Sequence, residues 1–261
     1  MLKAALDGYE GEERGAAWAR QQAQWGNSQA ELFITNFAGE LPAAFADCMS
    51  HIGEIFDMVE SVDLLKTPPG RTVIGVVGYS YQLLVSAWAD IAAGRLVAAY
   101  DHMRSIFEAP DYVLALAWDA DFRTQWRDQD ILEKKKAARA MKIARDGFNK
   151  NTGVEGDKRY AQRINDRKPL QVFAHVSTWA VGGTLLQPPG VKGGRFVIPQ
   201  GTITPYNTEA AVYLVVLAKE ILVALAFSDL LPDDWKDECG DTLAKVQPYL
   251  RGLNEAFQQQ N

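Results

Sequence analysis

Two long apolar stretches constrain the fold of this chain more than any other feature of its sequence. Residues 72–89 carry no charged side chain, and residues 210–227 are interrupted only by Lys219 and Glu220. Both are long enough to cross a membrane, but glycine, serine, tyrosine and glutamine lower the hydropathy of the first. Helices that are apolar on all sides also form the centre of large soluble bundles. We therefore expect two central helices of a soluble bundle and no membrane span.

Glycine and proline breaks divide the rest of the chain into further segments with helical spacing of apolar residues. Ser28 followed by Glu31 has the pattern of a capping box. We therefore expect one helix to end near Gly26 and the next to begin at Ser28 and run to about Val62, with a kink at Pro42. Later breaks have the same glycine and proline composition: residues 67–70, Gly94 and Pro110.

Residues 182–205 differ in kind from the helical segments. They contain Pro188-Pro189-Gly190 and a Gly193-Gly194 pair between two short β-prone runs, which is typical of a β-hairpin or an ordered loop. The sequence therefore predicts an all-α fold in a single domain over residues 1–261. It is a multi-helix bundle of roughly eight helices with this one short non-helical insertion.

Charge and cysteine content favour an ordinary cytoplasmic protein. The formal net charge is −6, so contact with nucleic acid or an anionic membrane requires a local basic patch. Cys48 and Cys239 lie far apart in predicted helices, which favours buried thiols in a reducing compartment over a disulfide. Residues 1–7 lack the long apolar core of a signal peptide.

Asp47, His51 and Glu54 form a stripe with the composition of a metal site. At about 100° per residue, the apolar side chains of this segment centre roughly 140° from Asp47. We therefore expect the stripe to face solvent, without a Glu-x-x-His partner on another helix. The chain also has no P-loop and no dinucleotide-binding glycine motif. The sequence predicts neither a metal nor a cofactor.

Residues 133–168 form a basic segment. It contains twelve basic and five acidic residues, a net charge of +7 that leaves −13 for the rest of the chain. Its first part carries the candidate anion-binding side chains Lys134, Lys135, Lys136, Arg139, Lys142 and Arg145. One interpretation is a solvated helical surface, and the other is a platform for an anionic ligand or RNA.

Arg95 and His102 have the spacing Arg-x6-His on one face of a predicted helix. This spacing resembles a nuclease signature of the HEPN group of helical proteins. There an arginine stabilises negative charge and a histidine provides acid–base chemistry for RNA cleavage. A dimer would bring the two pairs together.

Residues 98–109, which include Arg104-Ser105-Ile106-Phe107-Glu108-Ala109, resemble a helix of an uncharacterised family of bacterial and phage helical proteins with HEPN-like architecture. In that family a later His-x-Ser precedes a loop, and His175-Val176-Ser177 corresponds to it; the resemblance spans about residues 71–179. It implies a helical bundle in which Arg104, Glu108 and His175 approach one another, and it implies no established activity.

These observations lead to two functional hypotheses. The first is a soluble helical protein that acts by binding, as a homo-oligomer. The alternative is a metal-independent HEPN-like ribonuclease or RNA-binding protein that uses the basic segment, with Arg104, Glu108 and His175, or the pair Arg95 and His102, as its catalytic residues. The residues alone do not decide between an enzyme and a binding protein.

Overall fold

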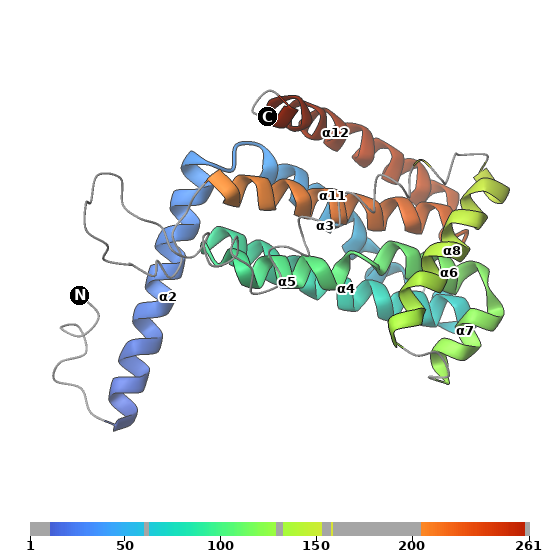
Figure 1. The fold of residues 1–261 in the computed structure, drawn as a ribbon, viewed down its shortest axis with the longest axis horizontal. Helices are drawn as coiled ribbons and strands as arrows, with labels where there is room; N and C mark the ends of the chain where they lie inside the picture. The colour runs from blue at the N-terminus through green and yellow to red at the C-terminus, as the bar shows by residue number, and fades with distance from the viewer. Residues whose placement is uncertain (1–10, 60–62, 129–132, 153–157, 159–204, 259–261) are drawn as a thin grey trace.

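A computed structural model describes residues 11–59, 63–128, 133–152, 158 and 205–258, and its regular elements there are all helical (Figure 1). They are α2 (Gly11–Asn36), α3 (Leu41–Met58), the 3-10 turn η1 (Leu64–Lys66), α4 (Pro68–Ala92), α5 (Leu96–Ile106), α6 (Ala109–Trp118), α7 (Ala120–Arg127), α8 (Glu133–Thr152), α11 (Pro205–Phe227) and α12 (Asp233–Gln258). The predicted all-α fold is confirmed. The predicted insertion at 182–205 lies outside the described residues.

The two apolar stretches form α4 and α11, which lie side by side in the centre of the bundle (Figure 1). Helix α4 packs against α5, α6 and α11, and α11 packs against α3, α6 and α5. Val77 and Leu84 of α4 and Leu214 and Ile221 of α11 are fully buried. These apolar side chains hold the bundle together because burial removes them from water.

By length and composition alone, α4 and α11 could each cross a membrane. Two such helices are weak evidence for a membrane span, because the core helices of a soluble bundle have the same length and composition. Most of the apolar stretch of α11 is buried within the protein, whereas a smaller part of the apolar stretch of α4 is buried. The expected cytoplasmic location therefore stays a prediction.

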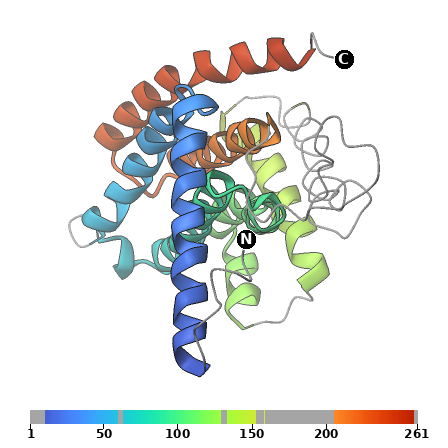
Figure 2. The ribbon, with the colours of Figure 1, turned by 90° about the vertical axis from the view of Figure 1, so that its left-hand side faces the viewer.

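The first described helix corrects a predicted boundary. Helix α2 continues through Gly26 and Ser28, and the Ser28 hydroxyl donates to the carbonyl of Gln24 one turn earlier instead of capping a new helix. The break comes later, at Gly39, which has a left-handed φ of 53°. Pro42 then lies in the first turn of α3, where its missing N–H costs no helical hydrogen bond. Helix α2 extends well beyond the bundle at one end (Figure 2).

The predicted boundary at Pro110 is confirmed. Helix α5 ends at Ile106, and α6 begins at Ala109 with Pro110 in its first turn. The side chain of Asp119 caps the next helix, α7, by accepting a 2.7 Å hydrogen bond from the Phe122 amide. This cap fixes the direction in which α7 leaves α6 and returns toward α4.

Helix α12 covers one side of α3, and this contact corrects a second prediction. Trp235 in the first turn of α12 stacks on His51, which is only 4% exposed. The prediction that His51 faces solvent is wrong because α12 covers it. Asp47, on the same stripe, is exposed as expected.

Candidate functional site

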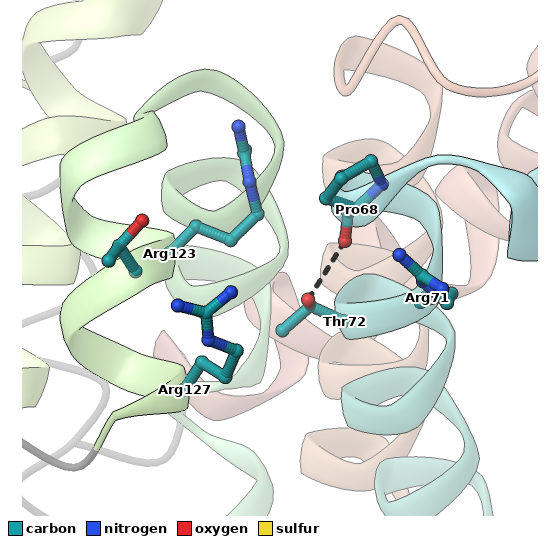
Figure 3. Close-up of a pocket in the computed structure, with 6 residues that line it drawn as sticks. Pro68, Arg71, Thr72, Arg123 and Arg127 are labelled. Carbon is teal, nitrogen blue, oxygen red and sulfur yellow. Dashed lines mark hydrogen bonds between the residues drawn. The ribbon is translucent and has the colours of Figure 1, made fainter.

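A pocket of about 340 Å³ lies between the first turns of α4 and the helix α7 (Figure 3). It is lined by Pro68, Arg71, Thr72, Arg123, Thr124 and Arg127. Three arginines therefore line one cavity, two from α7 and one from α4. We call this cavity the arginine pocket.

The start of α4 forms one wall of the arginine pocket. The hydroxyl of Thr67 accepts a 3.1 Å hydrogen bond from the Gly70 amide, and Pro68 and Pro69 have no amide hydrogen. A side chain at Gly70 would collide with the backbone carbonyl of Leu64. Because the cap and the prolines leave few free N–H groups here, the arginines supply the donors of the pocket.

The three arginines differ in their partners. Arg123 is partly buried and donates through Nη1 to the carbonyls of Leu116 and Ala117 at the end of α6. Arg127 is exposed and forms a two-point ion pair with Asp128, at 2.7 and 3.2 Å. The hydrogen bond from Arg127 lowers the pKa of Asp128. Arg71 is exposed.

Each of the two threonines of the arginine pocket uses its hydroxyl proton in a hydrogen bond within its own helix and keeps its oxygen lone pairs as acceptors. Thr72 donates its hydroxyl proton to the carbonyl of Pro68 at 2.9 Å, as Figure 3 shows. Thr124 donates to the carbonyl of Ala120 at 3.0 Å. The pocket thus presents guanidinium donors and two hydroxyl acceptors, which suits an anion that carries both oxygens and a hydroxyl group.

A second cluster lies at the other end of α4. Asp90, 8% exposed, accepts a 2.7 Å hydrogen bond from Nε of Arg95 on one carboxylate oxygen, and Nη2 of Arg95 forms an ion pair with the same oxygen at 2.6 Å. Its other oxygen lies 3.3 Å from Nε2 of His102. The predicted pair Arg95 and His102 is therefore joined through a third residue. We call this group the Asp90 cluster.

The turn between α4 and α5 builds the Asp90 cluster. Gly94 has a left-handed φ of 74°, and Arg95 is the residue before the first turn of α5. Asp90 is not among the residues predicted for a site, although it is the first charged residue after the apolar stretch 72–89. At 1.5 Å per residue along α4, Asp90 lies about 28 Å from Arg71. The cluster and the arginine pocket are separate sites.

The second predicted set, Arg104, Glu108 and His175, is only partly described. Arg104 and Glu108 are both partly buried, and Glu108 accepts a 3.4 Å hydrogen bond from the Tyr112 hydroxyl. His175 lies outside the described residues. Convergence of the three side chains therefore stays a prediction.

Part of the predicted basic segment packs against α7. Lys136 is 7% exposed, with its ammonium group over the Trp126 ring at 5.2 Å. Arg139 lies over Phe122 at 5.7 Å and donates to Gln125. These cations make cation–π contacts inside the protein.

The other described basic side chains of the predicted anion-binding set on α8 lie closer to solvent. Lys135 and Lys142 are exposed, and Arg145 pairs with Asp146 at 3.1 Å. The side chain of Lys134 and residues 153–157 and 159–168 lie outside the described residues. Among the described candidate anion-binding residues of α8, Lys135 and Lys142 are therefore the most exposed to solvent.

No protein family model matches the chain, and neither a curated protein nor a solved structure matches it. The resemblance to HEPN-like proteins therefore stays a prediction, and the functional argument rests on the geometry of the sites.

Proposed function

We propose that this protein binds a small phosphate-bearing ligand in the arginine pocket. The observation that carries the proposal is that Arg71, Arg123 and Arg127, from two helices, all line one cavity. Guanidinium groups match the geometry of phosphate oxygens and stay charged at all physiological pH values. Binding of an anion agrees with the first hypothesis drawn from the sequence, in which the protein acts by binding and not by catalysis.

The size of the arginine pocket limits the ligand. Its volume of about 340 Å³ is at the lower end of the range for small-molecule sites, about 300–1,000 Å³. A phosphorylated metabolite or a mononucleotide fits this volume, whereas a folded nucleic acid could place only one phosphate there. The hydroxyl acceptors of Thr72 and Thr124 add contacts for a ligand hydroxyl group.

Asp128 sets a condition on binding. Its carboxylate already occupies two donors of Arg127, so a ligand phosphate competes with it for that guanidinium. A phosphate dianion carries more charge than a carboxylate and accepts more hydrogen bonds. We expect Asp128→Asn to strengthen phosphate binding.

Calorimetric titration of the full chain with inorganic phosphate and with adenosine monophosphate tests the proposal. Arg127→Gln and Arg71→Gln should each weaken binding by about tenfold or more, because each removes charged hydrogen bonds to the anion. Arg20→Gln, which removes the same charge from an exposed position of α2 outside the pocket, is the matched control and should change affinity by less than about twofold. An equal loss of affinity in all three variants would show that binding depends on the net charge of the protein and not on the arginine pocket.

The Asp90 cluster favours a second function, metal-independent cleavage of RNA. Nε2 of His102 faces Asp90 at 3.3 Å, so in the neutral ring with its proton on Nε2 the lone pair of Nδ1 can accept a proton from a ribose 2′-hydroxyl. Arg95 remains about half exposed and can contact the phosphate. His102 is about one third exposed, so both side chains reach solvent.

Cleavage of labelled RNA in the presence of a chelator tests the second function. His102→Ala should lower the rate by about a hundredfold or more, as expected for loss of a general base. Asp90→Asn should also lower it, because the carboxylate orients the imidazole. His175→Ala separates this site from the predicted set with Arg104 and Glu108. Intact RNA with the unaltered protein, or equal rates for both histidine variants, would refute the role of His102.

A homo-oligomer also stays a proposal. Ile34 of α2 and Phe37, one turn later, are 50% and 38% exposed, and neighbouring exposed apolar side chains favour self-association. Light scattering after size-exclusion chromatography measures the mass directly. A monomeric mass at micromolar concentration would contradict the proposal.

A further inference from the structure

The imidazole ring of His51 is held between α3 and α12 by three contacts. Its Nε2 lies 3.2 Å from the backbone carbonyl of Trp235, and its ring stacks on the Trp235 indole with centroids 4.5 Å apart. Its Nδ1 lies 2.9 Å from a carboxylate oxygen of Glu54. The carbonyl can only accept, so it favours a proton on Nε2, and a second proton or a cation between Nδ1 and the Glu54 carboxylate would bridge those two groups.

A second carboxylate comes from α12. Glu238 lies three residues after Trp235, on the same face of the helix. The candidate ligand atoms of His51, Glu54 and Glu238 all lie within 4.8 Å of one another. The partner helix that the sequence analysis did not find is therefore α12, which supplies a glutamate in place of a Glu-x-x-His motif.

We propose that His51, Glu54 and Glu238 bind a divalent cation of the zinc class, which fastens α12 to α3. One imidazole nitrogen and two carboxylate oxygens are common zinc ligands, and water completes the tetrahedron. The imidazole ligand favours zinc over magnesium or calcium, which prefer oxygen ligands alone. This site is distinct from the arginine pocket and from the Asp90 cluster.

The geometry of the three groups fits this cation. Ligand atoms in a tetrahedral zinc site are about 3.3 Å apart. His51 Nδ1 and Glu54 lie 2.9 Å apart, and the Glu238 carboxylate lies within 4.8 Å of both groups, so small side-chain shifts would let the three surround one cation. The hydrogen bond from Nε2–H to a backbone carbonyl is the contact by which metal-binding histidines are generally oriented. Glu54 is about half exposed and Glu238 is exposed, so the cation can enter from solvent.

Calorimetric titration of the chelator-treated full chain with Zn²⁺ tests the proposal. We expect one saturable site per chain, and a melting temperature that rises with Zn²⁺ concentration. Glu238→Gln should weaken Zn²⁺ binding by about tenfold or more. Because Glu238 is exposed, this substitution leaves the fold intact, whereas His51→Ala would leave a buried gap beside Trp235.

Asp237→Asn is the matched control, since it removes one negative charge from the neighbouring exposed position of α12. It should change the affinity by less than about twofold. Lower pH should weaken binding in the unaltered protein, because a proton competes with the cation for Nδ1 of His51. A simple ion pair between protonated His51 and Glu54 would instead give no saturable Zn²⁺ binding. That result, or equal affinity in Glu238→Gln and the unaltered protein, would overturn the proposal.

Discussion

Asn207 donates a 2.6 Å hydrogen bond from its side-chain amide to the backbone carbonyl of Ile91, which lies 116 residues earlier in the chain. Both residues are fully buried. The bond joins the first turn of α11 to the last turn of α4, so it connects the two central helices at the end that carries the Asp90 cluster. The Ile91 carbonyl also accepts a 3.0 Å hydrogen bond from the Gly94 amide, so Asn207 supplies its second donor.

Replacing Asn207 with leucine should lower the free energy of unfolding by about 1 kcal/mol, because one of the two hydrogen bonds to the buried Ile91 carbonyl is lost. Urea denaturation monitored by circular dichroism measures this change. Asn36→Leu is the control, since Asn36 is exposed and its amide donates only to its own helix; we expect a change within about 0.5 kcal/mol. A loss for Asn207→Leu as small as that of the control would contradict the importance of this bond.

Two helical glycines should respond in opposite directions to substitution by alanine. A methyl group at Gly147 of α8 would collide with the ring of Trp118, and such overpacking costs about 1–3 kcal/mol. At Gly240 of α12 the added methyl group meets no other atom within 4 Å, so alanine should stabilise by about 0.5–1 kcal/mol. Thermal unfolding of the two variants checks the difference. Stabilisation of both would show that α6 and α8 are not packed as described.

The two thiols should be unreactive in the folded protein. Burial raises the pKa of both Cys48 and Cys239 to about 12, so the thiolate fraction falls about a thousandfold below that of an exposed cysteine. We expect no labelling by a disulfide reagent under native conditions and two labelled thiols per chain in denaturant. Rapid labelling of either thiol in the native protein would mean that α12 opens readily from α3 and α11.

Glu209 should make folding depend on pH. Partial burial raises its pKa above the ordinary value near 4.5, so the folded state holds the proton more tightly than the unfolded chain. The resulting stability is fully present below the unfolded pKa and is lost as the pH rises through the folded pKa.

Glu209→Gln should therefore be more stable than the unaltered protein at about pH 7 and equally stable at about pH 4. Melting temperatures at the two pH values measure this difference. The exposed Glu31 provides the control, because Glu31→Gln should show no such dependence. An equal effect of Glu209→Gln at both pH values would exclude ionisation as its cause.

Helix boundaries could be predicted from the sequence where a single residue prevents a helical hydrogen bond. The break at Pro110 follows from a residue that cannot donate an interior helical hydrogen bond, and the structure has it there. Ser28 also fits a capping pattern, yet α2 continues through it. A capping box contributes about 1 kcal/mol, which packing of a continuous helix readily outweighs. Phe33, farther along α2, packs edge-on against Trp88.

The candidate sites show a similar division. Spacing along one helix was enough to select Arg95 and His102, but Asp90 comes from the preceding helix and meets them only through the turn at Gly94. The arginine pocket joins Arg71 to Arg123 and Arg127, which are more than fifty positions away. A helical wheel describes a single helix, so it could not show that α12 covers His51.

The sequence by itself determined the apolar interior of this protein, because the uncharged stretch 72–89 and the nearly uncharged stretch 210–227 must be removed from water in any stable fold. It also determined most of the helix boundaries that depend on proline. Only the tertiary structure decided which polar side chains meet. Three arginines surround one pocket, Asp90 bridges Arg95 and His102, and Glu238 approaches His51. Each of these groups combines residues from two helices, and their distances depend on packing that no local pattern records.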